Sequence, residues 1–290
     1  MNLSSTFLGL FKDHKLSLLA PRDAETVSAQ GENVRGSKRR QAEAILTNVA
    51  HISAPFLTIF IIVHLSAPAL ANVGGSSLSS NVMVRDIISQ TKEMTFTASP
   101  TKLLGREYYQ TAFGERYLLF APLAAHVASN IAKRVISPRS ALAYPRRITS
   151  TLSLAAYSTL LIFLPIHFLT HRVYPADPSP PIFAVGPSEL DFEFVKTGLA
   201  KFPWRSWVLY GGLVASVMLH AVEGVQIIQA SRSASRNVRM CSRTRRIVVG
   251  VVLVPILAGL WTVSREPLMV FASLAERYEA TFTHSWVYRF

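Results

Sequence analysis

The chain has 290 residues and a formal net charge of +13; half of its residues are hydrophobic and 16% are charged. This composition indicates a membrane protein and argues against a large soluble core. The basic residues lie in short blocks between apolar runs, so the sequence contains no soluble basic module that would bind nucleic acid. Cys241 is the only cysteine, which excludes an intramolecular disulfide and a cysteine-based metal cluster.

Residues 1–44 precede the first apolar span and are predicted to form a mostly disordered cytosolic arm. They hold one short apolar patch, Phe7 to Phe11, and then turn polar and rich in small residues. Asp13, Asp23 and Glu25 argue against a mitochondrial matrix presequence, because such presequences are poor in acidic residues. The arm is therefore interpreted as a plain tail or as a binding segment for a partner.

Residues 45–265 are predicted to form an all-α, polytopic membrane bundle of about five transmembrane helices. A helix needs about 20 mainly apolar residues to cross the hydrocarbon core of a bilayer. Five stretches meet or nearly meet this length, and they cover residues 46–70, 116–132, 148–170, 206–228 and 247–263.

The basic residues predict how the bundle is oriented. Lysine and arginine precede span one and join spans two to three and four to five, whereas the other loops mix both signs of charge. Basic loops favour the cytosolic side, so we expect a cytosolic N-terminus and a C-terminus on the opposite side. Residues 266–290 are predicted to form an interfacial tail because they carry aromatic side chains: Phe271, Tyr278, Phe282, Trp286, Tyr288 and Phe290.

An internal two-helix repeat is predicted within the bundle. Leu57 to His64 of span one aligns with Leu164 to His171 of span three, where each copy ends on a histidine. One helix later, Tyr117 to Leu123 aligns with Trp207 to Leu213. Two short matches in the same order, both on apolar spans, indicate an ancient duplication.

Histidines inside the spans are the candidate functional residues, because ionisable side chains are costly within a bilayer. His126 and His220 lie near the midpoints of spans two and four, which run in the same direction. At about 1.5 Å rise per residue their depths should nearly coincide. Two such imidazoles can bind the two faces of one haem b iron, so both are predicted axial ligands, through haem iron only. The alternative is that they hydrogen-bond other helices.

The other polar residues in the spans are not predicted to bind a cofactor. His64, His167 and His171 lie near the non-cytosolic span ends, where an imidazole can extend towards the headgroups at little cost. Glu223 is predicted to lie near the cytosolic headgroups or to pair with an arginine of the following basic loop. No Ser/His/Asp set, phosphate-binding loop or paired-carboxylate site is present, so no enzymatic activity is predicted. Three glycines of span four are predicted to let a macrocycle or another helix approach closely: Gly211, Gly212 and Gly224.

Two short motifs carry a resemblance to a known superfamily. The stretch from Thr47 to Ser53, and the spacing of His220 and Gly224, resemble the membrane-anchor cytochrome b subunits of succinate dehydrogenase and fumarate reductase. In that superfamily the second helices of two related units hold haem b, which the resemblance maps to His126 and His220. Ile52 stands where an arginine usually follows the first-helix histidine, so no quinone site is carried over.

The layout of residues 45–265 resembles the fungal family of Mdm-complementing mitochondrial outer-membrane adapters. The shared features are the polar arm, the spans, the stretch from Gly105 to Gln110 and the basic loop after His220. The resemblance implies an outer-membrane protein in contact with membrane lipid that recruits a bridge-like lipid-transfer protein of the vacuolar-sorting class and supports lipid homeostasis at organelle contacts. Recruitment in that family uses a Pro-x-Pro motif in the arm, but here the motif at Pro178 to Pro180 falls on the opposite predicted side.

Two functions therefore stay open from the sequence. The first is a non-enzymatic membrane adapter, which could retain a structural haem b. The second is a haem-b electron-transfer subunit of the succinate dehydrogenase cytochrome b type. Substitution of His126 or His220 separates them, because only the second function requires these residues.

Overall fold

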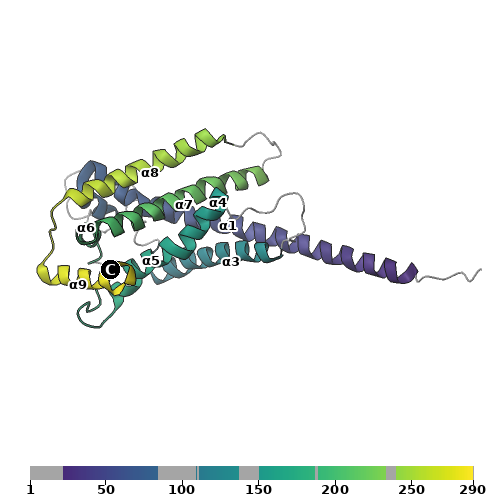
Figure 1. Ribbon diagram of the computed structural model, residues 1–290, viewed down its shortest axis with the longest axis horizontal. Helices are drawn as coiled ribbons and strands as arrows, with labels where there is room; N and C mark the ends of the chain where they lie inside the picture. The colour runs from purple at the N-terminus through teal and green to yellow at the C-terminus, as the bar shows by residue number, and fades with distance from the viewer. Residues whose placement is uncertain are drawn as a thin grey trace, which may run out of the picture.

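Figure 1 shows the computed structural model, which describes residues 22–83, 109, 111–136, 150–186, 189–232 and 240–289. In these ranges every regular element is helical. Short π-helical segments, Gly114–Phe120, Thr159–Phe163 and Leu169–Val173, precede α3, join α4 to α5 and follow α5. The α-helices are α1 Arg22–Met83, α3 Ala121–Ile136, α4 Thr151–Ser158, α5 Leu164–Phe168, α6 Phe192–Lys201, α7 Pro203–Arg232, α8 Ser242–Arg265, α9 Ala272–His284 and α10 Trp286–Arg289.

The predicted all-α membrane bundle is confirmed. Four helical stretches of the described chain are long and apolar enough to cross a membrane: Gly36–Ser77, Thr151–Ala176, Pro203–Ser231 and Ser242–Arg265. The remaining predicted span, residues 116–132, is also helical and packs along α1. Together with the π-helical segment Gly114–Phe120, α3 gives a continuous helical stretch that ends at Ile136, but this stretch is not among the four candidate spans.

Helix α1 is longer than its predicted span at both ends. Residues 22–44 of the predicted arm are helical and project beyond the bundle in Figure 1, whereas residues 1–21 lie outside the described part. At the opposite end, α1 bends at Gly74 and Gly75. Gly75 has a φ of 64°, a left-handed conformation that favours glycine, so the bend is encoded locally.

The two ends of the bundle differ. The projecting part of α1, the end of α3, the start of α4, the end of α7 and the start of α8 all lie at one end (Figure 1). Helices α6, α9 and α10 lie at the other end, where they form a cap. The C-terminal segment predicted as an interfacial tail is part of this cap, since Tyr278, Phe282 and Tyr288 are buried against Phe194.

Each long helix packs mainly on one or two neighbours, and glycine allows the closest approach. Helix α1 packs on α3 and α8, whereas α7 packs on α4 and α8. A Cβ atom added at Gly259 of α8 would lie 1.7 Å from the carbonyl oxygen of Pro68 in α1. Ala67 and Ala71 of α1 and Val263 of α8 are buried beside this contact. Small residues thus set the distance between the two helices.

Candidate functional site

The structure brings His126 of α3 and His220 of α7 together. Their ring centroids are 6.0 Å apart, and the ring planes are nearly perpendicular, at 89°. The two helices have different main neighbours, because α3 packs on α1 whereas α7 packs on α4 and α8. The two imidazoles meet between α3 and α7, at the matched depth that the helical rise predicts.

Hydrogen bonding fixes the ring of His126. Its Nδ1 lies 3.2 Å from the carbonyl oxygen of Ala50 and 3.3 Å from the hydroxyl oxygen of Ser53, both on α1. A protonated Nδ1 that donates to the Ala50 carbonyl leaves Nε2 with a free lone pair. For His220, Nδ1 is shielded from solvent without a hydrogen-bond partner in the described chain. The ring of His220 nevertheless has a hydrogen bond with the backbone of Leu152, at the start of α4.

The three predicted glycines of α7 have different surroundings. A Cβ atom at Gly224, one turn after His220, would meet no atom within 4 Å, so the backbone borders open space there. At Gly212 it would lie 2.3 Å from the ring of Phe163, and at Gly211 it would lie 3.8 Å from Leu257. Gly224 can therefore admit a ligand near His220, whereas Gly211 and Gly212 face neighbouring helices.

The distance between these two rings fits a pair of axial ligands to one haem b iron. Two imidazoles that bind one metal ion from opposite sides, with metal–nitrogen bonds of about 2 Å, have ring centroids about 6 Å apart. The centroid distance between His126 and His220 matches this requirement. The lone pair on Nε2 of His126 and the open space beside Gly224 meet two further requirements of a bound macrocycle.

A second group of histidines lies inside the bundle. His64, His167 and His171 were expected to extend towards the headgroups, but they turn towards one another. The ring centroids of His64 and His167 are 5.9 Å apart, and those of His167 and His171 are 4.4 Å apart. The hydroxyl of Tyr210 lies 3.1 Å from Nε2 of His171. Phe60 stacks on His64, with ring centroids 5.3 Å apart.

A cavity with several charged residues in its lining, to which the sequence did not point, lies at the capped end. It has a volume of about 590 Å³ and is bounded by the bend of α1, the start of α6 and the segment after α8. We call it the Lys196 cavity, because the side chain of Lys196 is only 3% exposed beside it. The residues that line it are Ser76, Ser77, Asp191, Phe192, Glu193, Lys196, Glu266, Pro267 and Met269.

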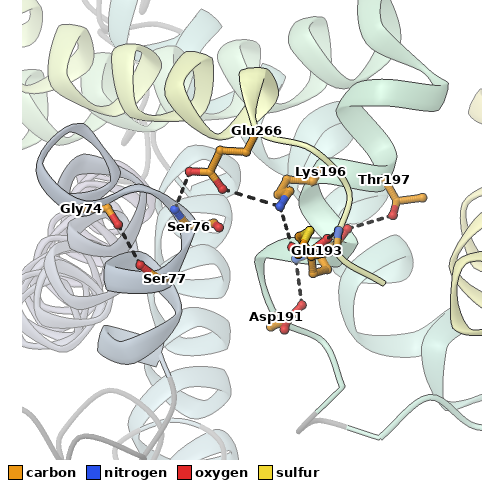
Figure 2. Close-up of polar contacts among 9 residues, drawn as sticks. Gly74, Ser76, Ser77, Asp191, Glu193, Lys196, Thr197 and Glu266 are labelled. Carbon is orange, nitrogen blue, oxygen red and sulfur yellow. Dashed lines mark hydrogen bonds and ion pairs between the residues drawn. The ribbon is translucent and has the colours of Figure 1, made fainter. Parts of the chain in front are cut away.

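Lys196 joins the three parts of this cavity (Figure 2). Its Nζ donates to Glu193 at 2.5 Å and lies 3.5 Å from a carboxylate oxygen of Glu266. The backbone amide of Ser76 donates to the other oxygen of Glu266 at 2.8 Å. The amide of Met269 donates to Glu193 at 2.8 Å. This chain of contacts ties α1, α6 and the end of α8 together.

The acids of the Lys196 cavity have different pKa values for different reasons. Burial raises the pKa of the Asp191 carboxyl above its usual value. Burial acts in the same direction on Glu266, but the hydrogen bonds from Ser76 and the nearby Lys196 ammonium outweigh it and lower the pKa of that carboxyl. The only sequence signal for the cavity is the spacing of Glu193 and Lys196, three residues apart on one helix face.

Residues 162–275 match the family model described as MDM10-complementing protein 1, transmembrane domain. This part of the chain is similar to that family. No curated protein and no solved structure matched the chain significantly. The resemblance to succinate dehydrogenase and fumarate reductase anchors therefore stays a prediction, whereas the predicted Mdm-complementing family is confirmed for the matched segment.

The segment that matches the family model holds much of the two candidate sites, the histidine pair and the Lys196 cavity. The matched segment includes His220, Lys196 and Glu266, whereas His126 and all of α1 lie before it. Together with the four candidate spans, the family match makes the protein a mitochondrial membrane protein with several transmembrane helices.

One further ion pair belongs to the same domain. Glu223, one turn from the end of the apolar part of α7, accepts a hydrogen bond from Arg245 of α8 at 2.5 Å. The predicted pairing of Glu223 with an arginine of the basic loop region is confirmed. The contact links α7 to α8 at the end where α1 projects.

Proposed function

We propose that the protein is an adapter of the mitochondrial outer membrane, with its N-terminus in the cytosol. In this function it recruits a bridge-like lipid-transfer protein of the vacuolar-sorting class and so supports lipid homeostasis at organelle contacts. The match to the MDM10-complementing family is the observation that carries the proposal. The projecting part of α1 supplies a surface on which such a partner could dock (Figure 1).

Charge supports docking at this end of the molecule. Lys38, Arg39 and Arg40 are exposed on the projecting part of α1, and Arg243 and Arg246 are exposed at the start of α8. Exposed basic groups at one end favour a cytosolic location and steer acidic partners towards it. The Pro-x-Pro segment at Pro178 to Pro180 lies at the capped end, so we assign it no docking role.

Neutralising the α1 charges tests the adapter proposal. We expect the combined variant Lys38→Gln, Arg39→Gln, Arg40→Gln to lower partner recruitment to mitochondria about tenfold, which corresponds to about 1.4 kcal/mol. Recruitment is measured as the amount of lipid-transfer protein that co-isolates with mitochondria. Lys201→Gln, at the capped end, is the control and should recruit normally. Normal recruitment by the triple variant, with a protease-accessible N-terminal tag, would contradict docking on α1.

We also propose that the bundle binds one haem b through His126 and His220, and the facing geometry of the two rings favours this second candidate function. When bound, haem b supplies one-electron redox chemistry. The chain's own residues position it: the Ala50 carbonyl orients His126, and the missing side chain at Gly224 leaves room beside His220. The haem would be structural in an adapter and functional in an electron-transfer subunit.

Visible spectra of the purified protein test the haem proposal. We expect a Soret band, with sharp α and β bands after dithionite reduction, that is lost in both His126→Ala and His220→Ala. His284→Ala is the matched control, because His284 is an exposed histidine of the cap, and it should keep the bands. A colourless wild-type protein, expressed with ample haem, would refute the site. Variants that lose haem but still recruit the partner would separate the adapter from the electron carrier.

A further inference from the structure

The Lys196 cavity carries a local negative charge. Three carboxylates, Asp191, Glu193 and Glu266, line it with a single lysine. The lysine is already paired with Glu193 and Glu266, so it adds no free positive charge. A ligand that enters the cavity must therefore be cationic where it meets these acids, because an anion would be repelled.

The amide donors that could bind an anion are already used. Asp191 accepts from the amide of Glu193 at 2.8 Å and caps the start of α6. Where α1 resumes after Gly75, the amide of Ser76 donates to Glu266. Both helix starts thus carry a protein carboxylate in place of a bound phosphate or other anion. The remaining acceptor capacity of the three acids suits a primary ammonium, which has three N–H donors.

The position of the cavity indicates that its ligand also has an apolar part. It lies where the spans Gly36–Ser77 and Ser242–Arg265 end, which is the depth of lipid headgroups. Large apolar side chains within three residues of its lining residues in the chain are exposed: Val73 by 82%, Met269 by 78% and Phe271 by 86%. Met269 also lines the cavity itself. A ligand with an ammonium head and apolar chains would satisfy both the acids and these side chains.

We propose that the Lys196 cavity binds the primary ammonium of an aminophospholipid headgroup, such as phosphatidylethanolamine, with the acyl chains along the exposed apolar side chains. Asp191 is the main acceptor, since neither Lys196 nor any other basic side chain in the described part of the chain pairs with it. This proposal is about a lipid that the protein itself binds. It goes beyond the adapter proposal, and its failure would leave docking on α1 untouched.

Short-chain lipids test this site on the full-length protein in maltoside micelles. Calorimetric titration should show that dihexanoyl-phosphatidylethanolamine binds at least about tenfold more tightly than dihexanoyl-phosphatidylglycerol, which has no amine. Dihexanoyl-phosphatidylcholine should bind more weakly than the ethanolamine lipid, because its quaternary ammonium has no N–H to donate. Free ethanolamine should bind weakly, since it lacks the apolar chains. Equal affinity for the ethanolamine and glycerol lipids would overturn the headgroup site, and tight binding of free ethanolamine would overturn its assignment to a lipid.

Conservative variants locate the binding on Asp191. Asp191→Asn keeps a good helix cap but removes the charge, and we expect it to lower the affinity for the ethanolamine lipid about tenfold. Glu276→Gln neutralises an exposed acid of α9 away from the cavity and should leave the affinity unchanged. Unchanged binding in Asp191→Asn would overturn the assignment. Should that variant fail to fold, the comparison of headgroups on the wild-type protein still decides the proposal.

Discussion

Gly259→Ala is expected to destabilise the bundle by about 3 kcal/mol, near the upper end for an overpacked core. The new methyl group would lie 1.7 Å from the Pro68 carbonyl oxygen, which is backbone and cannot turn aside as a flexible side chain could. Helices α1 and α8 must separate, so the buried contacts of Ala71 and Val263 loosen as well. Asn72, which donates to the Pro255 carbonyl at 2.7 Å, would lose this hydrogen bond. Unfolding of the purified protein by titration with sodium dodecyl sulfate measures the change.

The same helix offers a matched control for this prediction. A Cβ atom at Gly250 of α8 would meet no atom within 4 Å. Gly250→Ala should therefore be neutral or stabilise the protein by about 0.5–1 kcal/mol, because alanine has the higher helix propensity. If both variants lost stability equally, close packing at Gly259 would not be the cause.

Lys196→Met is expected to cost about 3 kcal/mol of unfolding free energy. The change keeps the apolar stem but removes the cation that Glu193 and Glu266 share. Two carboxylates then lie close together with no counter-ion, and an uncompensated buried charge is strongly destabilising. The loss of unfolding free energy should be at the low end of that seen when one partner of a buried ion pair is removed, because each carboxylate keeps one backbone hydrogen bond.

Two comparisons isolate the charge effect at Lys196. Lys201 pairs with Glu279 at 3.0 Å, but both side chains are about half exposed, so Lys201→Met should cost less than about 1 kcal/mol. Adding Glu193→Gln and Glu266→Gln to Lys196→Met should recover part of the lost stability, because no unpaired charge remains. Equal costs for Lys196→Met and Lys201→Met would show that the buried network contributes little.

Helix positions and membrane character follow from the sequence because they are local properties. A run of apolar residues long enough to cross a bilayer must satisfy its own backbone hydrogen bonds, so helices over all five predicted stretches could be foreseen. The matched depth of His126 and His220 follows in the same way from the regular rise of a helix. The pairing of Glu223 with a basic residue was foreseeable because a carboxylate in a span needs a partner.

Only the tertiary structure decided which way each helix faces and what lies opposite it. A span that is apolar all round gives no signal for its rotation, so the sequence did not show that His64 and His167 face each other. It also drew attention to the glycines of α7, although the tightest helix contact is at Gly259, since whether a glycine is needed depends on the partner helix. The Lys196 cavity combines Ser76, Glu193 and Glu266, whose distant positions in the chain are joined only by folding. Local sequence determined the helices and their depths, and packing between distant segments determined the sites.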